Sequence, residues 1–196
     1  MAETPEIGVA EPGRRLRAFV GLSLPDPVRA ALAPHLEECR RLAPGFRWTA
    51  PERLHVTLRF LGPVEPPSLA SVQEGLAAIA GRRFGLQLGD RGRFGPAAAP
   101  RVLWLGLSAG AEGCAILAGA IEDACRQAGL EPEPRPFRAH LTLARARTGH
   151  RRTGEAMPTL PPPPPTAGWE ADAFVLYESR LGTRPEYVEL ARYPLG

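Results

Sequence analysis

Hydrophobic residues recur along the chain with two different periods, which together predict a protein built from strands and helices. Over residues 15–24 every second side chain from Leu16 to Leu22 is apolar, the pattern of a strand with one buried face. Similar signals predict further strands near 46–49, 54–61, 84–90, 101–108, 137–145, 169–178 and 186–193. Apolar residues three or four apart predict helices near 66–80 and 112–128.

A further helix should begin at Pro25-Asp26-Pro27, with Asp26 as its N-cap. Its expected buried stripe is Val28, Leu32, Leu36 and Cys39. Pro34 lies inside this helix and is expected to kink or shorten it, because proline lacks a backbone N–H. Glycine and proline at 62–63 should likewise end the strand over 54–61.

The order of these elements repeats, since each half of the chain contributes strands and a helix. This predicts an α+β fold with two pseudo-symmetric lobes within one domain over residues 15–196. Residues 1–14 are expected to form a flexible tail. Pro158 and the prolines at 161–165 predict a stiff connector between elements.

The composition is that of a folded protein, with 44% hydrophobic and 23% charged residues among 196. No apolar run approaches the length that spans a membrane, and the first residues lack the apolar segment of a signal peptide. Three cysteines favour a reducing compartment over a disulfide framework, so we expect a cytoplasmic protein. No cysteine pair has zinc-ligand spacing, and we expect no metal or other cofactor.

The positive charge is unevenly distributed. The net charge is only +3, but all 24 basic residues are arginine, whose guanidinium group binds phosphate through two hydrogen bonds. Six arginines and no carboxylate lie between Arg135 and Arg152.

One tetrad occurs twice, as His55-Val56-Thr57-Leu58 and as His140-Leu141-Thr142-Leu143. The chain has only 4 histidines, so two copies are an improbable accident. In a strand, His and Thr two residues apart share one face, while the apolar residues between and after them face the core.

Two such strands across a groove would supply an acid and a base on opposite sides of a phosphate, with two hydroxyls to donate to its oxygens. We therefore expect His55, Thr57, His140 and Thr142 to perform acid–base chemistry without a metal or a covalent nucleophile.

Two arginines follow the tetrads. Arg59 has even spacing from His55 and should share its face. There we expect it either to contact phosphate or RNA or to form a salt bridge at the rim, with no preference between the two. Arg145 has odd spacing from His140 and should point away from the groove, unless the strand ends or bulges after Leu143. Each is a candidate substrate-binding residue.

The remaining aromatic and histidine residues near the motifs have weaker signals. We expect core positions for Trp48, Phe60 and Phe137, with base stacking as the alternative. We expect His35 on a helix, at the surface or in the core, and His150 in a basic loop.

The paired motif resembles that of the 2H phosphoesterase superfamily, and specifically its RNA 2′,3′-cyclic phosphodiesterases, the bacterial 2′–5′ RNA ligase family. The resemblance covers about residues 15–194. Supporting matches are Arg17-Ala-Phe-Val, Phe94-Gly95, Pro100-Arg-Val-Leu-Trp-Leu, Ser179-Arg-Leu and Tyr187.

The resemblance implies two antiparallel sheets that flank a central cleft, with helices outside. It implies hydrolysis of an RNA 2′,3′-cyclic phosphate to a 2′-phosphate, with His55 as proton donor and His140 as proton acceptor, and 2′–5′ ligation in reverse. It also suggests a basic residue at the position of Arg145.

The expected partners are RNA 3′ ends or nucleotide cyclic phosphates, bound by a monomer away from membranes. Two alternatives stay open: a binding module without catalysis, and a phosphodiesterase for small cyclic-phosphate nucleotides or 2′–5′ oligoadenylate. Steep salt dependence of binding would favour RNA over a small nucleotide.

Overall fold

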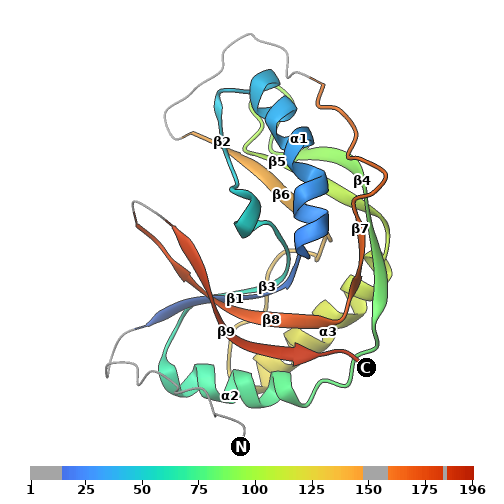
Figure 1. Ribbon diagram of the computed structural model, residues 1–196. Helices are drawn as coiled ribbons and strands as arrows, with labels where there is room; N and C mark the ends of the chain where they lie inside the picture. Colours follow the sequence, from blue (N-terminus) through green and yellow to red (C-terminus); the bar gives the residue numbers. More distant parts are fainter. Residues whose placement is uncertain (1–14, 148–158, 183–184) are drawn as a thin grey trace, which may run out of the picture.

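An antiparallel sheet curls through the whole of the computed structural model, which describes residues 15–147, 159–182 and 185–196 (Figure 1). Its strands are β1 (Leu16–Ser23), β2 (Phe46–Trp48), β3 (His55–Val64), β4 (Phe84–Phe94), β5 (Val102–Ala109), β6 (Leu141–Ala146), β7 (Gly168–Ala171), β8 (Ala173–Arg180) and β9 (Glu186–Pro194). The helices are α1 (Asp26–Leu42), α2 (Pro66–Ala77) and α3 (Ala111–Gln127), with a short 3₁₀ turn, η1, at Pro51–Arg53.

Over the described residues the sheet has nine strands, and eight of them form two halves of four strands each. Its order is β7-β4-β5-β6-β3-β1-β8-β9, with β2 also paired to β6. The halves meet where β3 lies beside β6, and the paired residues there are Val56 and Leu141. The predicted α+β class with repeated halves is confirmed, and the two expected sheets are continuous through this pair.

Helices α1 and α3 each cross over to the other half of the sheet. Each follows a strand of one half and packs against the strands of the other. Helix α1 follows β1, yet its Leu32 and Leu36 pack in one cluster with Leu105 and Leu143 of β5 and β6. Helix α3 follows β5, yet it packs with α2 against β3, β1 and β8 (Figure 1). A fully buried leucine stabilises a fold by about 2 kcal/mol, so this exchange ties the halves together.

The start of α1 differs from the prediction. Pro25, in an extended conformation, is the N-cap, and Asp26 lies in the first turn, where its carboxylate pairs with Arg29. An acidic group there also interacts favourably with the positive end of the helix dipole. The helix continues past Pro34 to Leu42, so the predicted shortening is wrong. The carbonyl that Pro34 leaves without a donor belongs to Ala30, an exposed residue that water can reach.

Three strand boundaries also differ. Strand β3 passes through Gly62, whose φ of 73° is easy only for glycine, and continues to Val64. The single strand expected over 169–178 is divided at Asp172 into β7 and β8, and the strand expected over 137–145 begins only at Leu141. The predicted tail 1–14, Pro158 and His150 lie outside the described residues. No described helix is long and apolar enough to cross a membrane.

Candidate active site

The two tetrads lie where the halves of the sheet meet. His55 is the first residue of β3, and His140 directly precedes β6. The apolar members Val56, Leu58, Leu141 and Leu143 are buried, as the alternation predicts, while the His and Thr side chains remain partly accessible on the opposite face. Adjacent strands thus carry both His–Thr pairs on one side of the sheet.

A backbone carbonyl two residues earlier orients each histidine. Nδ1 of His55 lies 2.8 Å from the carbonyl oxygen of Arg53, and Nδ1 of His140 lies 2.7 Å from that of Arg138. A carbonyl oxygen can only accept, so both Nδ1 atoms carry hydrogen and donate it. Each Nε2 is therefore the atom that exchanges protons. The sequence analysis did not identify these two carbonyls, since any residue type supplies one.

Aromatic side chains hold the rings of the histidines from the side. His55 stacks at a tilt on Phe19, with ring centroids 4.6 Å apart, and meets the edge of Tyr187 at 5.1 Å. His140 lies edge-to-face with Phe94 at 4.9 Å. Gly21 lets β1 approach β3 beside these rings, because a Cβ there would lie 2.9 Å from the carbonyl oxygen of Val56 and 3.5 Å from Cδ2 of His55.

Both imidazoles have lowered pKa values. Burial lowers the pKa of His55 to about 4, against the opposing effect of its hydrogen bond to Arg53, and the positive charge of Arg145 adds to the lowering. Burial also lowers the pKa of His140, and Arg145 and Arg138 contribute in the same direction. Both rings are therefore neutral at pH 7 in the protein without ligand. A bound anion would raise both values.

A β-bulge follows each histidine–threonine pair at the same place. On β3, Gly21 of β1 pairs with Thr57 and Val20 pairs with Arg59, so Leu58 is an extra residue. On β6, Trp104 of β5 pairs with Thr142, and the next pair joins Leu103 to Ala144, so Leu143 is the extra residue. A bulge of this kind reverses which face the following side chains occupy.

The bulge at Leu58 turns Arg59 toward the helices. Arg59 is only 7% exposed, forms ion pairs with Glu122 of α3 and with Glu133, and donates to the carbonyl oxygen of Glu131 at 2.6 Å. The geometry thus favours the salt bridge over the phosphate contact, although it is buried rather than at the rim. Phe60 takes the cleft-side position and is 41% exposed, so the expected core position for Phe60 is wrong.

The bulge at Leu143 has the opposite consequence for Arg145. It brings this odd-spaced side chain to the cleft, where Arg145 is exposed and borders cavities on both sides. Phe60 and Arg145 therefore occupy equivalent positions, each five residues after a tetrad histidine.

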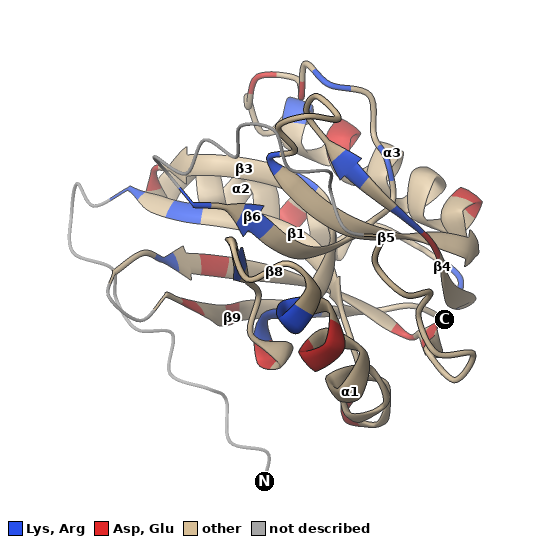
Figure 2. Cartoon of the chain, turned by 90° about the horizontal axis from the view of Figure 1, so that it is seen from above, with Lys and Arg blue, Asp and Glu red and all other residues tan. Residues whose placement is uncertain are grey.

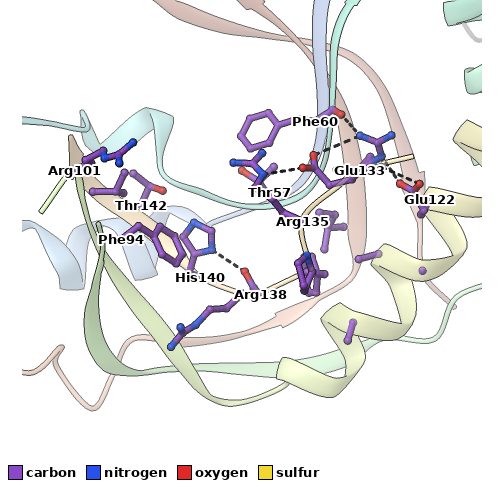
Figure 3. Close-up of a pocket in the computed structure, with 18 of the residues that line it drawn as sticks. Thr57, Phe60, Phe94, Arg101, Glu122, Glu133, Arg135, Arg138, His140 and Thr142 are labelled. Carbon is purple, nitrogen blue, oxygen red and sulfur yellow. Dashed lines mark hydrogen bonds and ion pairs between the residues drawn. The ribbon is translucent and has the colours of Figure 1, made fainter. Parts of the chain in front are cut away.

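Two adjoining cavities contain the tetrads. The His140 cavity, of about 730 Å³, is shown in Figure 3, and the His55 cavity has about 810 Å³. Five residues line both: Thr57, Phe60, Arg135, Thr142 and Arg145. A group at this shared wall would lie between the two histidines and beside both hydroxyls.

The other predicted residues are placed less centrally. Trp48 is half-buried, borders the His55 cavity and donates its indole N–H to the carbonyl of Ala43 at 3.1 Å. Phe137 is 37% exposed and borders the His140 cavity, so it is not a core residue. His35 is buried on α1, with Nε2 3.5 Å from the sulfur of Cys39. Within the described ranges, no three His, Cys, Asp or Glu side chains are grouped to hold a metal ion.

The family model of the 2′-5′ RNA ligase superfamily matches residues 25–183. The chain belongs to this superfamily. As a member of the 2′-5′ RNA ligase superfamily, it is 31% identical to the RNA 2′,3′-cyclic phosphodiesterase of Escherichia coli (strain K12), over 91% of this chain and 96% of the relative. It is 30% identical to that of Geobacillus stearothermophilus, over 93% of this chain, but spans only 58% of that relative's length.

The fold of this superfamily member is also found in solved structures. The crystal structure of E. coli LigT complexed with 3′-AMP has a TM-score of 0.78 and 28% sequence identity, and the match covers 92% of this chain and 98% of LigT. The predicted family resemblance and fold class are therefore confirmed.

Proposed function

We propose that this protein hydrolyses RNA 2′,3′-cyclic phosphate ends to 2′-phosphates by a two-histidine mechanism that needs no metal. Relatives that match nearly the whole chain are named RNA 2′,3′-cyclic phosphodiesterases, which supports this substrate. The complex of E. coli LigT with 3′-AMP supports a nucleotide site in this fold.

One observation carries the proposal: two histidines, each with Nδ1 bonded to a carbonyl oxygen so that Nε2 is the free nitrogen, border two cavities that share a wall. Displacement at phosphorus brings the nucleophile in opposite the leaving oxygen, so it needs a base and an acid on opposite sides. The cavities on the two sides of the shared wall contain His140 and His55, respectively. Binding alone would not require two proton carriers with the same fixed tautomer, which disfavours a module without catalysis.

The reaction then proceeds in one displacement. Nε2 of His140 takes a proton from water, whose oxygen bonds to phosphorus. The bond from phosphorus to the 3′ oxygen breaks, and Nε2 of His55 donates its proton to that oxygen. The products are a 2′-phosphate and a 3′ hydroxyl. The hydroxyls of Thr57 and Thr142 donate to the non-bridging oxygens, where charge builds in the transition state.

The lowered pKa of His55 makes its role as acid dependent on the substrate. With a pKa of about 4, the ring is neutral in the protein alone at pH 7. The negative charge of a cyclic phosphate beside Nε2 raises this pKa and favours uptake of a proton. Arg145 has the reverse effect on both histidines and is placed to balance the charge of the phosphate.

The same displacement would join a cyclic phosphate end to a 5′ hydroxyl that takes the place of water, and the two histidines would keep their roles. We also propose a monomeric, cytoplasmic protein. A small cyclic-phosphate nucleotide or 2′–5′ oligoadenylate as the physiological substrate is the alternative within the same chemistry.

The test uses a short RNA that ends in a 2′,3′-cyclic phosphate, with excess EDTA, and identifies the terminal phosphate of the product. We expect a 2′-phosphate, and a loss of about 10²–10⁴-fold in kcat for His55→Ala and for His140→Ala. Circular dichroism would check that both variants fold, and His35→Asn controls for the loss of a histidine outside the cavities. Unchanged RNA, or activity that survives both substitutions, would refute the mechanism.

A further inference from the structure

The two cavities differ in charge. Among the described residues, the His55 cavity is bordered by no carboxylate and by five arginines, which are Arg17, Arg47, Arg53, Arg135 and Arg145. Within the same ranges the His140 cavity is also bordered by five arginines, but it includes Glu122 and Glu133, whose carboxylates pair with Arg59 and Arg135. A polyanion therefore meets the stronger attractive field on the His55 side of the reacting phosphate.

Two of these arginines lie directly opposite each other on neighbouring strands. Arg47 of β2 pairs with Arg145 of β6, so both side chains leave the same face of the sheet. Figure 2 shows this basic segment of β6 in blue. Both residues are exposed. Like charges in direct cross-strand register destabilise a sheet, and an anion bound between them offsets that cost.

Arg17 extends the same surface on a third strand. It alternates with Phe19 on β1, and Phe19 stacks on His55, so Arg17 lies on the cleft side. Neither Arg17 nor Arg47 pairs with a carboxylate of the described residues, whereas Arg15 pairs with Glu65 at 2.9 Å only two positions from Arg17. Arg17 and Arg47 keep their hydrogen-bond donors available for a ligand.

The proposed mechanism places the RNA on this side independently of charge. In an in-line displacement the ribose carries the leaving 3′ oxygen, so it lies beside the acid, and water enters beside the base. With His55 as the acid, the ribose and all preceding nucleotides lie in the His55 cavity. The charge distribution and the reaction geometry agree.

We propose that Arg17, Arg47 and Arg53 form a subsite for the RNA phosphates that precede the cyclic end, so that the chain leaves the active site through the His55 cavity. This inference rests on the proposed function and adds a preference for oligonucleotides. Arg53 borders the first preceding phosphate, since it lies two residues from His55. Arg47 and Arg17, on β2 and β1, border those further along.

The experiment compares kcat/KM for a tetranucleotide and for a single nucleotide, both ending in a 2′,3′-cyclic phosphate. We expect the unmodified protein to favour the tetranucleotide. In Arg17→Gln/Arg47→Gln the ratio of the two kcat/KM values should fall by about tenfold. The slope of log KM against log salt for the tetranucleotide should become shallower by about 1.4, because each arginine that no longer neutralises a phosphate accounts for about 0.7. The control Arg82→Gln/Arg126→Gln removes the same two charges from exposed residues outside both cavities and should leave the ratio within about twofold.

The outcomes separate the two proposals. If the unmodified protein hydrolyses neither substrate, the proposed function fails. If it hydrolyses both without preference, or if the double variant keeps the preference and the salt slope, the function stands and this subsite is refuted. Binding of a tetranucleotide with a 2′-phosphate end provides a readout without turnover, and the double variant should bind it more weakly.

Discussion

The two tetrads have similar backbones and are followed by different side chains at the next two positions. Each begins with a histidine whose Nδ1 donates to a carbonyl, and each has a bulge at its fourth residue. After the bulge, the core-facing residue is Arg59 in one half and Ala144 in the other. The next, cleft-facing residue is Phe60 in one half and Arg145 in the other.

This comparison indicates a division of labour between the halves. The shared backbone places two equivalent Nε2 atoms, so the strands fix the proton chemistry. The residues after the bulges do not affect that geometry, and they differ in charge and size. One half presents an aromatic surface to the cleft and the other presents a cation, which suits a ligand with a base at one side and a phosphate at the other.

The largest expected effect distinguishes the two histidines. We predict that replacing the bridging 3′ oxygen of the cyclic phosphate with sulfur restores most of the activity of His55→Ala and none of that of His140→Ala. A thiolate leaves without a proton, so only the variant without its acid benefits. The measurement is single-turnover kinetics with both substrates, where each variant loses about 10²–10⁴-fold on the oxygen substrate. Rescue of His140→Ala alone would exchange the two roles.

The core-facing positions, Arg59 and Ala144, should differ in how much they contribute to the free energy of unfolding. We expect Arg59→Ala to lower the free energy of unfolding by about 3–5 kcal/mol, because Glu122 and Glu133 lose their buried partner. Urea denaturation measures this loss. Arg59→Met/Glu122→Leu removes the cation together with one of its two carboxylate partners and should be less destabilised than Arg59→Ala. If Arg59→Ala were as stable as the unmodified protein but bound substrate more weakly, Arg59 would be a phosphate-binding residue instead.

The cleft-facing positions should differ in what they recognise. Arg145→Gln should weaken every cyclic phosphate substrate by a similar factor, because the phosphate is common to all. Phe60→Ala should cost about 1–3 kcal/mol of binding if a base stacks on the ring, and less for an abasic cyclic phosphate than for a nucleotide. KM values for both substrates give the comparison. Equal effects of Phe60→Ala on the two substrates would show that the ring does not contact the base.

The smallest effect concerns the stability of the fold against acid. Because the pKa of His55 falls from 6.5 to about 4 on folding, the unfolded chain binds the proton first as the pH is lowered. The free energy of unfolding should therefore be fully retained above pH 6.5 and decrease toward pH 4, by at most about 1.4 kcal/mol per pH unit from this residue. His55→Asn should flatten this dependence in urea titrations at pH 7 and 5. An identical slope in the variant would contradict the buried, neutral ring.

The sequence was sufficient for the central residues because their signal is local. Strand period predicted that His55 shares a face with Thr57 and His140 with Thr142, and repetition predicted that the two pairs meet at one groove. The helices at 66–80 and 112–128 were found within a few residues. The orientation of Arg59 and Phe60 was not predictable by alternation, because one extra residue at Leu58 exchanges the two faces.

Other errors had a similar cause. The strand through Gly62 continues because the sheet accommodates a left-handed residue there, and no local rule distinguishes this from a turn. The carbonyls that orient the histidines carry no sequence signal. The continuity of the two halves depends on Val56 and Leu141, which are 85 positions apart.

Because each Nδ1 hydrogen is fixed by a carbonyl, the protonation states of the two histidines after one turnover differ from those at its start. Neither ring can pass a proton from one nitrogen to the other, so every proton enters and leaves through a single atom. After hydrolysis His55 has lost the proton from Nε2 and is neutral, whereas His140 has gained one and is charged. This is the reverse of the arrangement at the start. The protein must exchange both protons with water before it can hydrolyse another cyclic phosphate or join one to a 5′ hydroxyl, because both displacements start from the same protonation states.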